Sequence, residues 1–292
     1  MKYAYFTGCV AKGTTPELNV STLRVAEKLG IELEEMKSAS CCGAGMIEEY
    51  SEDMARALNG RTLALAERDG LDILTICNVC TLNLRKANKE LKEDPEVMER
   101  TNQVLGKVGL QYKGGVDVTQ FLWALVRDFG LDKLKAMVKH PLTGFKVAPF
   151  YGCQILRPSE LNGFDDPNNP TSLESVITAL GAEPVDYDGK TKCCGFLLLT
   201  VYEETSLAMT GKHLQQAKEA GANCMVTPCP LCHINLDIYQ SKIETQMGTK
   251  IDLPIFHLPQ LVGLALGIAP AALRLTRNMV NPYKLLHEAG VR

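Results

Sequence analysis

The sequence has no excess of positive charge. Its 31 lysines and arginines are balanced by 34 aspartates and glutamates, which gives a formal net charge of −3 at pH 7. Nucleic-acid binding and polybasic attachment to membranes both require a dominant positive field. We therefore expect no nucleic-acid partner and no polybasic membrane contact.

Long apolar segments are also missing. The charge-free stretch from Leu261 to Leu273 has thirteen residues, whereas a transmembrane helix needs about 20. The first residues, Lys2 to Phe6, look like a strand and contain no apolar core or cleavage site of a signal peptide. We expect a cytoplasmic protein without a membrane span. Leu261–Leu273 is expected to be a buried or partner-facing helix, and the residues from Asn281 onward an exposed tail.

Cysteine, in contrast, is abundant, with eleven residues in 292. Cytoplasmic thiols are kept reduced, so such a number favours metal binding or redox chemistry over structural disulfides. Ten of the cysteines fall into two sets of five. The first set is Cys9, Cys41, Cys42, Cys77 and Cys80, and the second set is Cys153, Cys193, Cys194, Cys229 and Cys232.

The two sets share one layout, in which a single cysteine is followed by a Cys-Cys-Gly and then by a Cys-x-x-Cys. The gaps between these parts are 31 and 34 residues in the first set and 39 and 34 in the second. The surrounding sequence repeats as well, since residues 146–153 align with residues 2–9 at an offset of 144. The segments 118–122 and 258–262 are also related, which aligns His257 with Asp117. The chain is therefore an internal duplication.

The apolar patterns predict an α/β fold. Strands are expected at 2–6, 31–36, 71–76 and 224–226, with amphipathic helices at 18–29 and 51–68. Residues 94–144 look like a helical connector covering one sheet edge, with 118–122 starting an apolar helix. We expect two Rossmann-like units related by a pseudo-two-fold axis, with extra helices. Residues 1–144 would hold the first repeat and the connector, and residues 145–292 the second repeat and C-terminal helices.

Five cysteines exceed the four ligands that a structural zinc site or a regular four-iron cluster takes. Neighbouring cysteines point in different directions, so Cys41 and Cys42 more easily serve two metal atoms than one. This favours a multinuclear cluster in each repeat, with Gly43 and Gly195 letting the backbone pass close to it. A zinc site with one spare redox-active cysteine, or a thioredoxin-like dithiol, remains open at this point.

These motifs resemble those of the CCG domain family and, within it, most of all the B subunits of soluble heterodisulfide reductases of methanogenic archaea. The resemblance implies two noncubane [4Fe-4S] clusters, each held by one cysteine set, and catalysis next to Cys41, Cys42, Cys193 and Cys194. The substrate would be the mixed disulfide of coenzyme M and coenzyme B, which is reduced to two thiols in one-electron steps. The implied partners are a ferredoxin-like iron–sulfur subunit and a flavin-containing subunit that bifurcates electrons, with a hydrogenase or formate dehydrogenase upstream.

Both coenzymes are anionic, so cationic side chains are expected around the substrate. The candidates are Lys12, Arg85, Lys86, Arg157, Lys190, Lys192 and His233. His257 is a candidate acid. Cys224 has no counterpart in the first repeat and is expected to be a buried apolar residue.

A second hypothesis keeps the clusters but makes the chain the electron-transfer subunit of a quinone-linked dehydrogenase acting on a 2-hydroxy acid, glycerol phosphate or succinate. A third is a zinc-stabilised scaffold without redox function, because zinc does not change its oxidation state.

Overall fold

The computed structural model describes residues 1–291 and contains two four-stranded parallel sheets of matching topology. The first sheet has the order β2-β1-β3-β4 and the second the order β6-β5-β7-β8. In the first sheet the strands are β1 (Lys2–Phe6), β2 (Glu32–Glu35), β3 (Ile73–Thr75) and β4 (Val118–Gln120). In the second they are β5 (Lys146–Pro149), β6 (Glu183–Pro184), β7 (Cys224–Thr227) and β8 (Ile255–His257). The predicted fold, an internally duplicated α/β structure, is confirmed.

Helices connect and cover the strands. Those of the first repeat and its connector are α1 (Cys9–Gly13), α2 (Pro16–Leu29), α3 (Ile47–Tyr50), α4 (Glu52–Arg68), α5 (Asn78–Glu93), α6 (Pro95–Gly106), α7 (Phe121–Trp123), the π-helical η1 (Ala124–Gly130) and α8 (Leu131–Met137). Those of the second are α9 (Ser159–Asn162), α10 (Ser172–Ala179), η2 (Asp188–Thr191), η3 (Phe196–Leu198), α11 (Glu203–Glu219), α12 (Pro230–His233), the π-helical η4 (Ile234–Ile238), α13 (Gln240–Met247), α14 (Leu258–Ala265), η5 (Leu275–Arg277) and α15 (Tyr283–Glu288).

Local sequence explains where helix α2 begins and ends. Pro16 occupies its first position, where a missing N–H costs nothing, and Gly30 ends it in the left-handed conformation with φ of 68°. Leu18, Val25 and Leu29 form its buried face. The helix therefore presents one apolar stripe to the rest of the protein.

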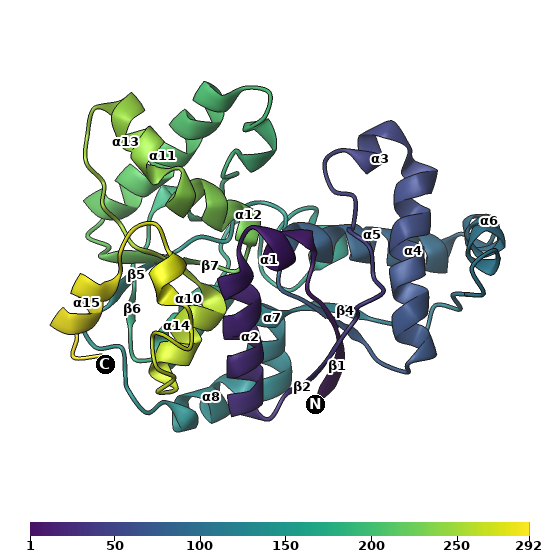
Figure 1. The fold of residues 1–292 in the computed structure, drawn as a ribbon, viewed down its shortest axis with the longest axis horizontal. Coiled ribbons are helices and arrows are strands. Elements are labelled where there is room, and N and C mark those ends of the chain that lie inside the picture. Colours follow the sequence, from purple (N-terminus) through teal and green to yellow (C-terminus); the bar gives the residue numbers. More distant parts are fainter. Residues whose placement is uncertain (292) are drawn as a thin grey trace.

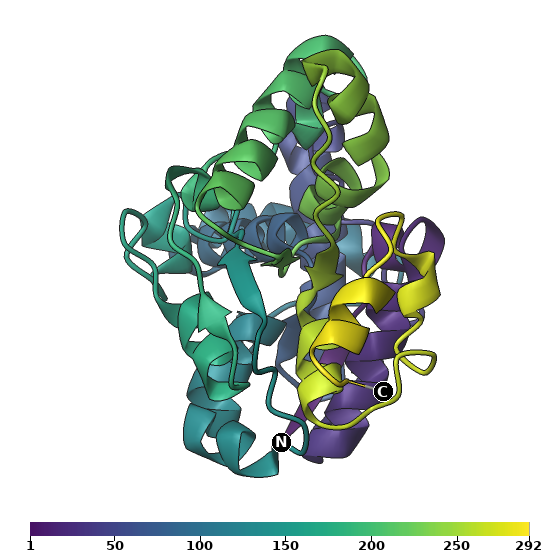
Figure 2. The same cartoon turned by 90° about the vertical axis from the view of Figure 1, so that its left-hand side faces the viewer.

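That stripe packs against the other repeat. Helix α2 packs against α14, which follows the last strand of the second sheet. In the same way, α10 of the second repeat packs against α7, η1 and α8, which follow the last strand of the first sheet. Figures 1 and 2 show the C-terminal helices, in yellow, beside the purple helix α2. Each repeat thus covers the other with the helices that follow its fourth strand.

Three expectations about local structure were wrong. Residues 118–120 form the short edge strand β4, and the helix begins only at Phe121. In sheet register β4 matches β8, so the counterpart of His257 is Gln120 and not Asp117. The C-terminal segment is not an exposed tail, because Leu285 and Leu286 of α15 are buried.

Other expectations were met in full or in part. Cys224 is fully buried in β7, as expected. The stretch Leu261–Leu273 met the expectation only in part, because residues 261–266 are buried but the helix ends at Ala265 and residues 267–272 are exposed or half-buried. Among residues 1–291, no helix combines the length and the apolar character that crossing a membrane requires.

Candidate metal centre

Both Cys-x-x-Cys motifs lie where a buried strand gives way to a helix. Cys77 follows β3 and precedes the first residue of α5, and Cys229 holds the same position between β7 and α12. The two motifs meet at the centre of the molecule, where the thiols of Cys77 and Cys229 are close enough to shift each other's pKa. Figure 1 shows α1 and α12 close together at this point, between the two lobes. The carboxyl edges of the two sheets therefore share one site.

The structure brings the five cysteines of each set together. In the first set, Sγ of Cys41 lies 3.4 Å from Sγ of Cys9, and Sγ of Cys42 lies 3.5 Å from Sγ of Cys80. All five line a cavity of about 190 Å³. The second set lines a smaller cavity of about 30 Å³. The sulfurs are spread along the cavity walls, and within residues 1–291 no three Cys, His, Asp or Glu side chains converge on a single ion position.

The two cavities share an apolar wall. It consists of Val79, Phe196, Leu197 and Leu231, which line both cavities. Among residues 1–291, no Lys, Arg, His, Asp or Glu side chain lines either one. The two sets differ in exposure, since Cys9 and Cys41 are exposed whereas Cys153 and Cys193 are only partly so.

Glycines bring the backbone close to the sulfurs. Gly8 and Gly152 have φ of 75° and 71°, and a Cβ added to them would lie 3.3 Å from Sγ of Cys80 and 2.9 Å from Sγ of Cys232. Gly43 also has a positive φ, but a Cβ there would meet Ile47. Sequence reasoning singled out the Cys-Cys-Gly glycines and missed Gly8 and Gly152. The Gly-Cys pair that both repeats share was the available signal.

A second layer of side chains holds the Cys-Cys-Gly loops. The carbonyl of Cys42 accepts hydrogen bonds from Asn59 (3.0 Å) and Asn83 (3.4 Å). The carbonyl of Cys194 accepts them from Thr210 (2.7 Å) and Asn235 (2.9 Å). In addition, Nε2 of the buried His213 lies 3.0 Å from the carbonyl of Cys193. These residues fix both loops through equivalent helices.

The first cysteine of each Cys-Cys pair is set up as a thiolate. Thiol donors from Cys42 and Cys9, together with the N–H of Gly43, lower the pKa of Cys41 to about 2. Thiols of Cys153 and Cys194, with the N–H of Gly195, lower the pKa of Cys193 to about 2 in the same way. Hydrogen bonding to the Cys41 thiolate in turn raises the pKa of Cys42 to about 12.

This donor set fits a cysteine-ligated inorganic cluster. Thiolates are the ligands of iron–sulfur clusters, and each cavity is walled by five cysteines and by apolar side chains. In each repeat a glycine, Gly8 or Gly152, also leaves space beside a cysteine sulfur. The ten cysteines Cys9, Cys41, Cys42, Cys77, Cys80, Cys153, Cys193, Cys194, Cys229 and Cys232 would hold the clusters.

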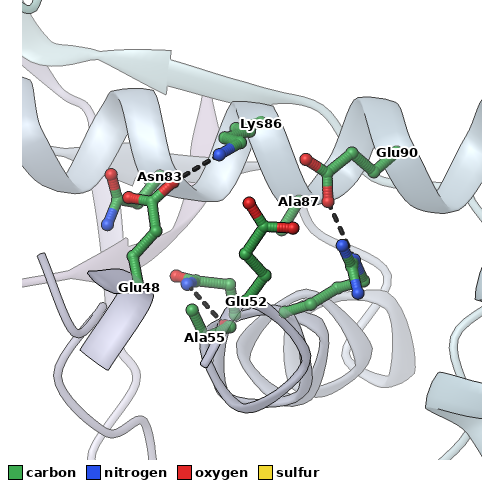
Figure 3. A pocket seen from close by; sticks show the side chains of 9 residues that line it. Glu48, Glu52, Ala55, Asn83, Lys86, Ala87 and Glu90 are labelled. Atoms are coloured by element: carbon green, nitrogen blue, oxygen red, sulfur yellow. Dashed lines mark hydrogen bonds and ion pairs between the residues drawn. The ribbon is translucent and has the colours of Figure 1, made fainter. Parts of the chain in front are cut away.

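Most of the candidate cations lie elsewhere. Lys12 is next to Cys9 and Cys41 in a separate cavity of about 130 Å³, where it pairs with Glu35 at 3.4 Å. Lys86 pairs with Glu48 in the pocket shown in Figure 3. Arg85 donates to the carbonyls of Leu161 and Val118.

The remaining cations belong to the second repeat. Arg157 donates to the carbonyls of Thr191 and Pro167. Lys190 pairs with Glu174 and Asp186, and Lys192 is exposed one residue before Cys193. The structure does not gather these side chains around the cysteine cavities.

The two candidate histidines are buried together. The rings of His233 and His257 stack with centroids 3.6 Å apart, and Nε2 of His257 lies 3.5 Å from a carboxylate oxygen of Glu17. Neither histidine lines a cysteine cavity.

Comparison with known proteins decides the family. The model of the cysteine-rich domain, CCG, matches the chain twice, at residues 3–85 and 147–237. The chain belongs to the cysteine-rich CCG domain family. Each match covers one repeat and all five of its cysteines, so the duplication seen in the two sheets is a duplication of this CCG domain.

Relatives with this pair of CCG domains align over nearly the whole chain. The chain is 40% identical to the 8-methylmenaquinol:fumarate reductase membrane anchor subunit of Wolinella succinogenes, covering 97% of this chain and 99% of that protein. It is 35% identical to the B subunit of the ferredoxin/F420H2-dependent CoB-CoM heterodisulfide reductase of Methanosarcina acetivorans, covering 98% and 96%. These relatives are components of oxidoreductase complexes.

A solved structure of a hypothetical protein from Helicobacter pylori shares the fold. It has a TM-score of 0.78 and 16% identity, covering 96% of this chain and 52% of that one.

Proposed function

We propose that the chain is an iron–sulfur electron-transfer subunit of a quinone-linked oxidoreductase complex, with one noncubane [4Fe-4S] cluster in each cysteine set. When bound, the clusters would supply one-electron transfer. The observation that carries the proposal is the apolar character of the site, because a lipophilic quinone fits such surroundings better than a highly charged substrate does.

Apolar side chains continue from the shared wall to the protein surface. The segments that follow the two Cys-Cys-Gly motifs, including α3, the start of α4 and η3, expose large apolar residues, which we call the apolar rim: Met46, Tyr50, Met54, Leu197, Leu198, Val201 and Tyr202. Tyr50 is 83% exposed and Met46 is 80% exposed. The two segments approach each other, since a Cβ on Gly45 would lie 3.0 Å from Leu197. Exposed apolar clusters of this kind commonly mark binding sites.

The chain's own residues would perform three tasks. The cysteine thiolates would hold the redox centres, and the proximity of Cys77 and Cys229 would allow single electrons to pass between the two sets. The shared wall excludes water from the space between them. The apolar rim would receive the quinone beside the more exposed first set. The relative from Wolinella succinogenes, whose name includes a methylmenaquinol, supports this assignment.

Heterodisulfide reduction is the second candidate, and one observation favours it. The two cysteine sets adjoin, so the two sulfurs of one disulfide could each meet a different centre as their bond breaks and two electrons arrive. The 35% identity to the B subunit of a heterodisulfide reductase supports it too. In that case the ferredoxin-like and flavin-containing subunits would be the partners. The apolar lining makes an anionic heterodisulfide the poorer fit, and most of the candidate cations are engaged elsewhere.

An assay with two alternative substrates separates these functions. The purified protein, reconstituted under anaerobic conditions, is mixed with a reduced viologen and either a short-chain menaquinone analogue or the coenzyme M–coenzyme B disulfide. We expect reduction of the quinone and not of the disulfide. Turnover with the disulfide alone would overturn the quinone assignment. Metal analysis should give about eight irons per chain if each set holds four, and zinc without iron would contradict both candidates.

The apolar rim can be tested separately. Leu198→Ser and Val201→Ser should raise the KM for the quinone analogue several-fold while iron content stays unchanged. Val108→Ser is the matched control, because Val108 is 62% exposed but lies just past the end of α6, outside the rim. If the control variant changed the KM as much as the two rim variants, the rim would have no specific role.

A further inference from the structure

The second repeat contains a buried acid–base chain that plays no part in the function proposed above. His233, His257 and Glu17 are at most 4% exposed. Glu17 accepts a hydrogen bond from the half-exposed Arg277 at 2.9 Å and lies 3.5 Å from Nε2 of His257, whose ring stacks on His233. Neither ring nitrogen of His257 has a hydrogen-bond partner, and Nε2 is the one that faces Glu17. A chain of polar groups thus leads from the surface to a buried ring nitrogen that can accept a proton.

This chain ends beside the second cysteine set. His233 directly follows Cys232, and the charge of Cys229 acts on the imidazole of His257. His257 ends β8, which pairs with the strand that leads to Cys229. A redox centre in the second set would therefore lie close enough to exert its charge on the imidazole of His257.

The first repeat has no such groups at the equivalent places. Sheet register matches His257 with Gln120, which donates to the carbonyl of Pro228 and cannot titrate. The residue that follows Cys80, in the place of His233, is Thr81. The acid–base chain is therefore an asymmetry between two otherwise matching sites.

The groups around His257 define its resting charge. Glu17 comes from α2, His233 from α12, and Cys229 immediately precedes α12, while Arg277 of η5 and Asp237 of η4 act on Glu17. Burial lowers the pKa of His257, although Glu17 opposes this. Glu17 is also buried, which favours its neutral form, but the nearby His257 and the hydrogen bond from Arg277 lower its pKa overall. A neutral imidazole beside a carboxylate paired with arginine is thus the resting state.

We propose that the Glu17–His257 pair takes up one proton when the redox centre held by the second cysteine set gains one electron, so that this centre alone has a pH-dependent potential. The inference rests on the proposed function only for the presence of a redox centre in each set. The electron comes from an external one-electron donor, and a proton from solvent binds to the imidazole of His257, which faces Glu17 and its partner Arg277. The imidazolium is then paired with Glu17, and no covalent bond of the chain breaks.

The physical reason is charge compensation in a medium of low dielectric constant. An added electron increases the negative charge near the imidazole, and a nearby negative charge favours the protonated form. By linkage, a proton that binds more tightly to the reduced state makes reduction easier at lower pH. The first set, flanked by Gln120, offers no proton acceptor at the equivalent place.

The test is a potentiometric titration of the reconstituted protein at pH 6, 7 and 8, followed by electron paramagnetic resonance. Cys41→Ser, which disturbs the first centre, identifies which signal belongs to which set. For the second centre we expect the reduction equilibrium to change tenfold per pH unit, which is about 59 mV for one electron. For the first centre we expect no change.

Two variants make the test specific. His257→Gln, which copies the residue of the first repeat, should abolish the pH dependence of the second centre while its iron is retained. Glu17→Gln should also reduce it, and this variant decides the matter if His257→Gln fails to bind iron. A wild-type second centre without pH dependence, or a dependence that survives in both variants, would overturn the proposal. Failure of quinone reduction would leave these potentials measurable, so it would count only against the proposed function.

Discussion

At one glycine beside the cysteine sulfurs there is no room for even a single added Cβ atom. Gly152 has a left-handed φ of 71°, and an added Cβ would lie 2.9 Å from Sγ of Cys232. Gly221 also has a positive φ, of 91°, but nothing lies within 4 Å of the equivalent position. Alanine variants at both positions would strain the backbone, but only the variant at Gly152 would also press on a cysteine sulfur. Comparing them distinguishes the effect of strain from the effect of that contact.

Gly152→Ala should displace the thiol of Cys232 and empty the second set. Iron content is expected to fall from about eight to about four atoms per chain, if each set holds four. Gly221→Ala imposes a similar backbone strain of about 1–2 kcal/mol but should keep all its iron. Iron and protein analysis of both purified variants checks this, and equal iron loss in both would show that strain alone is responsible.

Asp237 makes the free energy of unfolding decrease as the pH rises. Burial raises its pKa to about 7, although the N–H groups of Met279 and Val280 oppose this by donating to the carboxylate. An unfolded aspartate has a pKa of about 3.9. Between these values only the folded state keeps the proton, so this group's contribution to stability is lost as pH rises, by up to about 4 kcal/mol.

Asp237→Asn cannot titrate and should lack this loss. Urea denaturation midpoints at pH 5 and pH 8 test this, since the stability of the variant relative to wild type is expected to increase at the higher pH. All other titrating groups cancel in the comparison. Parallel pH profiles for the two proteins would contradict the expected behaviour of Asp237.

At the scale of elements, the sequence predicted the strands and helices whose apolar pattern is long enough to be recognised. The strands before both Cys-x-x-Cys motifs and helix α2 were visible because buried runs and amphipathic spacing extend over enough residues. Strand β4 has only three residues, too few to show a period, so its residues were assigned to the helix that follows. The consequence was a three-residue error in the alignment of the repeats, which concealed the relation between His257 and Gln120.

Strand β4 also links the repeats. Gln120 at its end donates to the carbonyl of Pro228 at 2.9 Å, and Pro228 immediately precedes Cys229. A first-repeat strand thus fixes the entrance to the second Cys-x-x-Cys motif.

Gln120→Leu should leave this buried carbonyl without a partner, at a cost of about 1–3 kcal/mol. We expect a lower urea midpoint together with a changed electron paramagnetic resonance spectrum of the second centre. Gln103→Leu on the exposed surface of α6 is the control and should alter neither. A spectrum unchanged in Gln120→Leu would show that the link affects stability alone.

On the scale of the whole molecule, the repeats depend on each other for burial. Helices α2 and α14, which come from opposite repeats, pack together, and one apolar core includes Val25 of the first and Leu261 of the second. The sequence predicted the duplication but not this exchange, because a pattern of apolar residues shows that a face is buried without showing against what.

Residues 1–144 and 145–292 should consequently fail to fold when expressed alone, since each would expose the face that the other covers. Co-expression of the two pieces should give a one-to-one complex. Size-exclusion chromatography with iron analysis checks this. A monodisperse, iron-loaded single piece would contradict the expected interdependence.

At the site, too, the sequence predicted some features and not others. The grouping of the ten cysteines into two sites was predictable because their spacing repeats, and the structure places each set of five around one cavity. The candidate cations were not decidable, since a long side chain such as that of Lys86 or Arg85 reaches whichever partner the fold offers. In the structure these partners are Glu48 and two backbone carbonyls.

The reciprocal packing of helices between the repeats has a consequence for the origin of the chain. An ancestor with one repeat would have carried both an α2-like face and the apolar helix that covers it, yet it could not have joined them within one molecule. Two copies would have joined both faces at once around a two-fold axis, as isologous dimers do. Gene fusion would then have made the two halves inseparable and free to diverge, which is how one site could gain a titratable histidine while its twin kept a glutamine.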